Sequence, residues 1–145
     1  MKRNARFFAA TFLLLASPAM AHVRVLPFSS KTGGQQTYTM KVPTEVKVPT
    51  TSVELEIPAG VSIISIADPA ETRKLDGRIV SITWKTDIAP DQSRDFNFVA
   101  INPKTDQDMA WKAHQHYADG TSRDWVDAPK TKSPASITKL SANPD

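Results

Sequence analysis

Alternation of apolar and polar residues in short runs separated by proline and glycine most strongly limits the folds open to this chain. In "SVELEIP", Val53, Leu55 and Ile57 project to one side of an extended chain, and the glutamates between them project to the other. The same period of two runs through "TYTMKV", "RIVSITW", "RDFNFVAI" and "AWKAHQHYA", which is typical of strands with one buried face. Most of the 11 prolines lie between these runs, as ladders of backbone hydrogen bonds require. The pattern predicts an all-β protein: a two-sheet antiparallel β-sandwich, immunoglobulin- or cupredoxin-like.

The alternation also predicts which side chains point inward. We expect one buried face in each run, and no helix of convincing length competes with the strands. The polar segment 130–145 contains "SITKL", which either adds one terminal strand or frays. The residues expected on inward faces are Tyr38, Met40, Val42, Phe96, Phe98, Trp111, Ala113, Gln115 and Tyr117.

The first residues have the pattern of a secretory signal peptide. Three basic residues precede the apolar run "FFAATFLLLA", and the small-residue motif Ala19-Met20-Ala21 follows it. The apolar run is shorter than the roughly 20 residues that a membrane-spanning helix needs. We therefore expect residues 1–21 to be removed between Ala21 and His22. The product would be one domain, residues 22–145, located in the periplasm and without a membrane span.

Charge and cysteine content exclude several functions. Of the 18 Lys+Arg residues, three lie in the signal peptide, so 15 basic residues remain against 15 Asp+Glu. A domain of zero formal charge gives no reason to expect nucleic-acid binding, which needs a clustered basic surface. Cysteine is absent, which removes thiolate zinc sites, cysteine-ligated blue copper and iron–sulfur clusters. Any metal ion must be bound by nitrogen and oxygen.

Cleavage after Ala21 would turn His22 into a two-nitrogen ligand. A histidine at the first position offers its α-amino nitrogen and its imidazole Nδ1, which together close a six-membered chelate ring. Cu(II) suits such a ligand, because it prefers tetragonal nitrogen and oxygen coordination. The amine has a reference pKa of roughly 7.7–8.0 and must lose its proton, so affinity should fall as the pH drops.

Five segments, in order, cover nearly all of the chain after the signal peptide. They are "HVRVLP" (22–27), "TYTMKVPTE" (37–45), "VELEIPAGV" (53–61), "ITWKTDIAPDQSRDFNFVAINP" (82–103) and "WKAHQHYADGTSRDW" (111–125). This ordered set resembles the YcnI-like family of exported copper-binding domains. The resemblance implies a β-sandwich that binds one Cu(II) ion through a single-histidine brace.

Three positions match the residues that bind the ion in this family. The resemblance implies that His22 supplies the chelate, that Glu45 of "VPTE" supplies a carboxylate oxygen, and that Trp125 of "DGTSRDW" stacks close to the ion and excludes water. Arg24 departs from the family pattern and brings a positive charge near a cation site. The segment "ADPAETRKLDG" (67–77) replaces the Pro-Gly-Trp commonly found midway.

These features favour a non-enzymatic protein of the cell envelope that acquires, delivers or buffers Cu(II). Its partner would be a membrane copper importer or another periplasmic copper chaperone, and transfer would proceed by ligand exchange. One alternative is a copper oxygenase with a second histidine in the brace. His114 and His116 are the candidates, and their spacing puts them on one face of a strand. The other alternative is a metal-free interaction or adhesion module, since a sandwich fold does not decide function.

Overall fold

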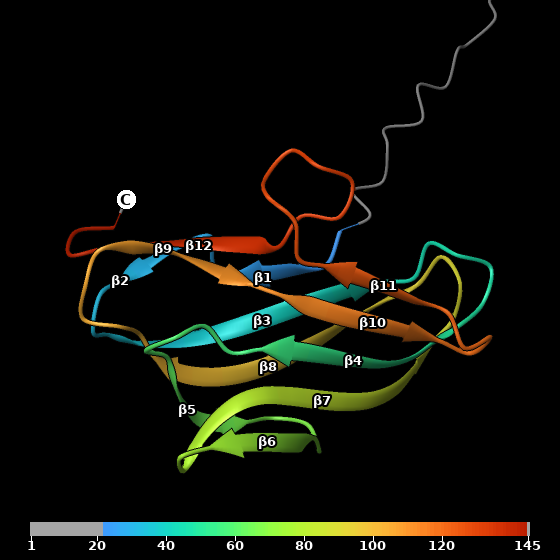
Figure 1. The fold of residues 1–145 in the computed structure, drawn as a ribbon, viewed down its shortest axis with the longest axis horizontal. Helices are drawn as coiled ribbons and strands as arrows, with labels where there is room; N and C mark the ends of the chain where they lie inside the picture. The colour runs from blue at the N-terminus through green and yellow to red at the C-terminus, as the bar shows by residue number, and fades with distance from the viewer. Residues whose placement is uncertain (1–21, 145) are drawn as a thin grey trace, which may run out of the picture.

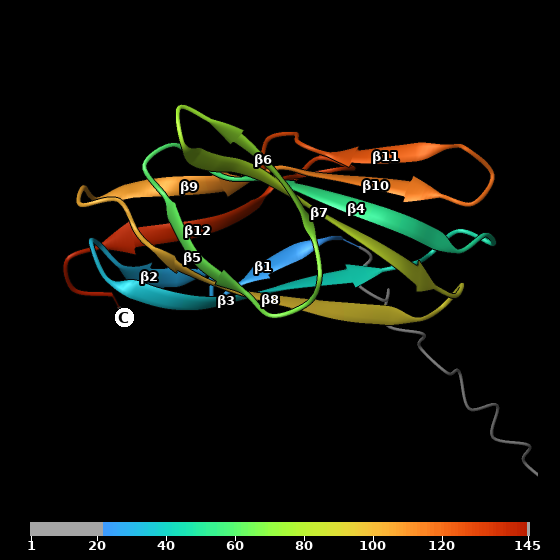
Figure 2. The same ribbon diagram turned by 90° about the horizontal axis from the view of Figure 1, so that it is seen from below.

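The computed structural model describes residues 22–144 and contains strands but no helix in this range. The predicted signal peptide lies outside the described residues. Two main antiparallel sheets pack face to face (Figures 1 and 2), as the alternation predicted. The first consists, in spatial order, of β1 (Arg24–Leu26), β3 (Gln35–Pro43), β8 (Ser93–Ile101) and β5 (Ser62–Ile66). The second consists of β11 (Ser122–Trp125), β10 (Ala113–Tyr117), β4 (Thr50–Glu56), β7 (Arg78–Ile88) and β6 (Glu71–Leu75).

Aromatic residues from both sheets form the centre of the core. Trp84 of β7 packs against Phe96 of β8, with ring centroids 5.2 Å apart, and Tyr38 of β3 packs against Trp111 at 4.9 Å. All four rings are almost completely buried, and burial of such large apolar surfaces stabilises the sandwich. The nine residues named as inward-facing are all buried, including Gln115, and so are Val53 and Leu55, whereas Ile57, just beyond the end of β4, is half-buried.

A small third sheet consists of β2 (Ser29–Lys31), β12 (Ser136–Ser141) and β9 (Gln107–Trp111). The strand considered at "SITKL" is present as β12, which pairs antiparallel with β9 and parallel with β2. This parallel pair was not foreseen from the alternation. The side chain of Ser136 accepts a hydrogen bond from the Val25 amide at 2.9 Å, so β12 also fixes β1.

The segment 67–77 forms the outermost strand of the five-stranded sheet. β6 is exposed along its whole length and pairs with β7. Asp76 and Gly77 connect the two strands with positive φ angles of 50° and 77°, as a tight hairpin turn requires. This edge lies four strands away from the opposite edge, β11.

The N-terminal end of the described chain lies where the two main sheets meet. β1 is an edge strand of one sheet and β11 is an edge strand of the other. In Figure 1 the chain enters β1 close to the end of β11. His22, just before β1, and Trp125, the last residue of β11, consequently come into contact.

Candidate metal centre

The contact between His22 and Trp125 is the centre of the candidate site. Their ring centroids are 5.4 Å apart and their planes are tilted by 56°. Trp125 is only 2% exposed, whereas His22 is half-buried. The guanidinium group of Arg123 lies 5.4 Å from the Trp125 ring centroid, within cation–π range. The indole therefore covers one side of the His22 imidazole and is itself held by its neighbours.

Trp125 is fixed by a buried glutamine. Its Nε1 donates a hydrogen bond to Oε1 of Gln115 at 3.0 Å. The amide nitrogen of Gln115 donates to the Pro43 carbonyl at 2.8 Å and to Oγ1 of Thr50 at 2.7 Å. Gln115 is fully buried, and all of its polar atoms have partners. It thus links β11, β10 and the segment that carries Glu45.

Glu45 is exposed and lies two residues beyond Pro43. Burial raises the pKa of the Tyr117 hydroxyl, while Arg123 opposes this shift and the Glu45 and Asp119 carboxylates add to it. The structure brings His22 and Trp125 into direct contact, and Gln115 links Trp125 to Pro43, two residues before Glu45. No hydrogen bond or ion pair among residues 22–144 joins Glu45 to His22.

The donor atoms near His22 are few. Within residues 22–144, no group of three or more His, Asp or Glu side chains is arranged to hold a metal ion. Also within that range, no hydrogen bond to a neighbouring side chain engages the His22 ring. Among the described residues, the candidate centre therefore consists of one imidazole and one indole, and Glu45 stands on the segment that Gln115 links to the indole.

A hollow of about 360 Å³ borders His22. Phe28, which is 51% exposed, and Ile137 give it apolar walls, while Arg24 and Lys130 add positive charge. One guanidinium nitrogen of Arg24 is buried without a hydrogen-bond partner in the described chain. The cation noted as a departure from the family pattern is therefore part of the immediate surroundings of His22.

His114 has a different environment from His22. Its Nδ1 lies 2.7 Å from a carboxylate oxygen of Asp124, and its Nε2 lies 2.7 Å from one of Glu56. Burial of the ring opposes protonation, but the hydrogen bonds to these two carboxylates outweigh it and raise the pKa of His114 above its usual 6.5. The carboxylates engage opposite ring nitrogens, so the three groups form an ion-pair bridge across three strands.

The two histidines of "HQH" do share one face of β10, as their spacing predicted. Their side chains alternate with buried Gln115, so they project away from the core face on which Gln115 meets Trp125. The structure therefore does not bring His114 or His116 to His22. The second histidine that a copper oxygenase would need is not supplied by this arrangement.

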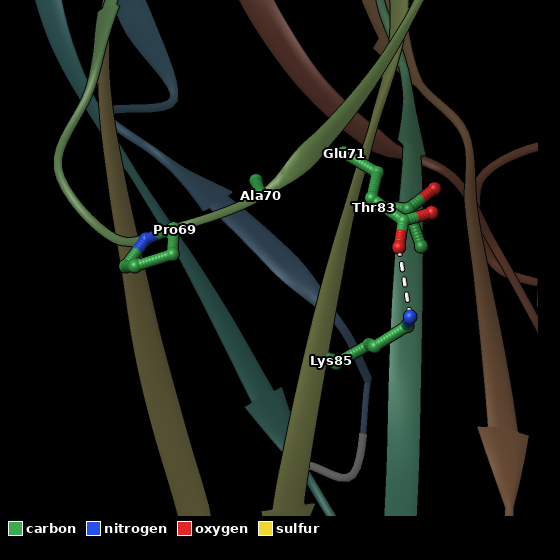
Figure 3. Close-up of a pocket in the computed structure, with 5 residues that line it drawn as sticks. All are labelled: Pro69, Ala70, Glu71, Thr83 and Lys85. Carbon is green, nitrogen blue, oxygen red and sulfur yellow. Dashed lines mark ion pairs between the residues drawn. The ribbon is translucent and has the colours of Figure 1, made fainter.

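A second hollow, of about 340 Å³, lies between β6 and β7 at the far edge of the five-stranded sheet. Figure 3 shows Lys85 reaching Glu71 there, and their charged atoms are 2.8 Å apart. The hydrogen bond to Lys85 holds the pKa of Glu71 below its usual range. Both side chains are strongly exposed. This is an ordinary surface ion pair, which gives the hollow no evident chemistry.

The fold and the contact at its edge define a class: an immunoglobulin-like β-sandwich with a histidine–tryptophan contact just before its first strand. Residues 22–140 match the family described as Domain of unknown function (DUF1775), and the chain belongs to this family. It is 39% identical over 139 residues to the Copper-binding protein CutI of Bacillus subtilis (strain 168), covering 91% of this chain and 68% of that protein. The resemblance to the YcnI-like family is thereby confirmed.

Solved structures agree on the fold. A crystal structure of an uncharacterized protein from Nocardia farcinica, described as immunoglobulin-like, is similar with a TM-score of 0.69 and 25% identity, over 83% of this chain and 99% of that one. A non-cellulosomal cohesin from Archaeoglobus fulgidus has a TM-score of 0.51 and 11% identity, over 83% and 90% of the two chains. The second likeness concerns the fold alone. The predicted immunoglobulin-like sandwich is confirmed.

The alternation predicted that Gln115 faces inward, but it did not predict the hydrogen-bond partners of its side chain. Its polar side chain stands in a row with Trp111, Ala113 and Tyr117, all of which are buried. A buried amide must find hydrogen-bond partners, so a glutamine in an apolar row is itself a signal of a specific polar network. The position of Arg123 over Trp125 had no comparable signal in the sequence.

Proposed function

We propose that the chain, once cut before His22, binds one Cu(II) ion as cargo and serves copper acquisition, delivery or buffering in the cell envelope. His22 binds the ion with its α-amine and Nδ1, Glu45 contributes a carboxylate oxygen, and Trp125 lies against the ion. The copper-binding relative, 39% identical over most of this chain, supports copper as the ion. The role is binding and transfer rather than catalysis.

The single observation that carries this proposal is the 5.4 Å contact of the His22 ring with Trp125, which is 2% exposed. A first-position histidine alone is a mobile chelator. Packing against a fixed indole orients the imidazole, excludes water from one side and adds the attraction of an aromatic face for a cation. The backbone amine completes the chelate, and it becomes available only when the bond between Ala21 and His22 is cut.

Glu45 offsets charge in this site. Arg24 and Arg123 already surround the His22–Trp125 contact with positive charge, so a divalent cation there requires a nearby anion. Glu45 is exposed, and Gln115 links the segment that carries it to Trp125. Its carboxylate thus has the freedom to move onto the ion when the ion arrives.

The hollow beside His22 supports a role in transfer. A brace of two nitrogens and one carboxylate leaves coordination positions for a donor atom from another molecule. The adjoining space of about 360 Å³ gives such a donor room to approach. A membrane copper importer or a second periplasmic chaperone would take the ion by ligand exchange.

The experiment compares Cu(II) binding by two preparations, one starting at His22 and one with a single extra alanine before it. Both fold alike, but only the first has the His22 amine. We expect the extra residue to weaken binding by more than the roughly 100-fold typical of changes around a ligand, and to remove the nitrogen-rich tetragonal paramagnetic resonance spectrum. Equal binding by both would place the site elsewhere. If neither preparation binds Cu(II), the copper proposal fails, and the metal-free interaction module becomes the favoured function.

A further inference from the structure

We infer that Gln115 is the positioning residue that holds both halves of the copper site in register, Trp125 on one side and the Glu45 segment on the other. The inference rests on the proposed function. Gln115 itself does not contact the ion. It acts by positioning Trp125 and Glu45, which do.

The hydrogen bonds fix the orientation of the Gln115 amide without ambiguity. Its oxygen faces the Trp125 indole N–H at 3.0 Å, which can only donate. Its nitrogen faces the Pro43 carbonyl at 2.8 Å, which can only accept. If the amide were rotated by half a turn, its N–H group would face the Trp125 N–H, and its oxygen would face the Pro43 carbonyl oxygen. Neither pair could form a hydrogen bond.

The same pattern explains why glutamine is required at this position. A glutamate would keep the acceptor for Trp125 but would set a carboxylate oxygen against the Pro43 carbonyl. A methionine would keep the length and volume but would leave the buried indole N–H without its acceptor and the half-buried Pro43 carbonyl without this donor. Buried polar groups without partners cost about 1–3 kcal/mol each.

Gln115 also reaches the Glu45 segment by a second path. Its nitrogen donates to Oγ1 of Thr50, and the Thr50 and Thr44 hydroxyls lie 2.6 Å apart. Thr44 is the residue immediately before Glu45, and both threonines are buried. Two linked contacts from one fully buried side chain therefore hold the backbone on which Glu45 stands.

The molecule contains a matched network that includes neither Trp125 nor the segment carrying Glu45. Trp111 donates from Nε1 to Oγ1 of Thr138 at 3.0 Å, and the Thr138 hydroxyl donates to the Pro27 carbonyl at 2.9 Å. Thr138 is fully buried, as Gln115 is. It links an indole to a proline carbonyl in the same way, but its indole does not contact His22.

The test measures Cu(II) affinity, paramagnetic resonance spectrum and unfolding free energy for Gln115→Met and Thr138→Val, both starting at His22. Both variants should lose stability. We expect Gln115→Met to weaken Cu(II) binding about 10- to 100-fold, the range for groups that orient metal ligands, and to change the spectrum. Thr138→Val should bind Cu(II) as the parent does.

Parent-like affinity and spectrum in Gln115→Met would overturn the inference while leaving the proposed function intact. Equal weakening in Thr138→Val would also overturn it, because general loss of stability would then explain the effect. If the parent protein itself binds no Cu(II), the proposed function fails first. If Gln115→Met does not fold, Thr50→Val replaces it, because this substitution removes one of the two paths from Gln115 to the Glu45 segment. Thr50→Val should weaken Cu(II) binding severalfold. Unchanged binding would overturn the inference.

Discussion

His22 and His114 are two histidines of one domain with opposite surroundings. His114 has a carboxylate 2.7 Å from each ring nitrogen, so both of its donor atoms are already used. The His22 ring packs against the tilted ring of Trp125, and within residues 22–144 no hydrogen bond occupies its ring nitrogens. The His114 ring is held between two carboxylates from neighbouring strands, and the His22 ring has nitrogens available to a ligand.

The difference shows that the availability of donor atoms, rather than the presence of nearby acidic residues, separates a candidate metal ligand from a structural histidine. His114 has the richer set of carboxylates, yet these sit on opposite sides of its ring and cannot share an ion with it. His22 has a fixed aromatic neighbour and an adjoining hollow. Substitutions at the two histidines should therefore affect different properties of the protein.

The largest expected effect is on copper affinity. His22→Ala removes the imidazole while keeping a first-position amine, and it should weaken Cu(II) binding by more than about 100-fold, since it deletes a ligand rather than a group supporting one. His114→Gln should leave the affinity unchanged within error. Calorimetric titration of the two variants measures both. Comparable weakening by His114→Gln would mean that the Glu56–His114–Asp124 bridge takes part in metal binding.

The next effect concerns the indole of Trp125, which contacts His22. Trp125→Phe removes an N–H that Gln115 accepts at 3.0 Å, and it leaves the Gln115 oxygen without a donor. Trp84→Phe is the matched control, because the buried Nε1 of Trp84 has no hydrogen-bond partner in the described chain. We expect Trp125→Phe to cost about 1–3 kcal/mol more unfolding free energy than Trp84→Phe. Urea denaturation measures this, and equal losses would show that packing alone holds Trp125.

The alternation of the sequence was sufficient to predict the sandwich and the inward faces of its strands. Burial follows a period of two that a single sequence displays directly, as at Tyr38, Met40 and Val42. A single sequence does not display the pairing of edge strands in this way. The expectation that His22 and Trp125 share one site therefore came from the family resemblance, and their direct contact is a finding of the structure. The partners of Gln115 and His114 lie up to 72 residues away along the chain, and no local pattern specifies such contacts.

A smaller effect should distinguish His114 by its pH dependence. Its pKa is raised in the folded state, so the folded protein holds this proton more tightly than the unfolded chain does. The stabilisation is complete below the usual pKa of 6.5 and is lost as the pH rises through the raised value. His114→Gln should therefore lower stability more at about pH 6 than at about pH 8, by about 1 kcal/mol or less after solvent screening. A larger loss at the higher pH would indicate that the ring is neutral in the bridge.

The smallest effect is expected at the opposite edge, where Glu71 and Lys85 pair in a hollow of similar volume to the one beside His22. Both side chains are exposed to solvent, and the entropy lost in holding two long side chains together offsets the attraction between them. Glu71→Gln should leave both the melting temperature and the Cu(II) affinity unchanged within error. Differential scanning calorimetry at low and high salt checks the first point, and titration checks the second. If Glu71→Gln lost as much stability as His114→Gln, in a salt-dependent way, then solvent exposure would not explain why the Glu71–Lys85 pair contributes less to stability than the His114 bridge.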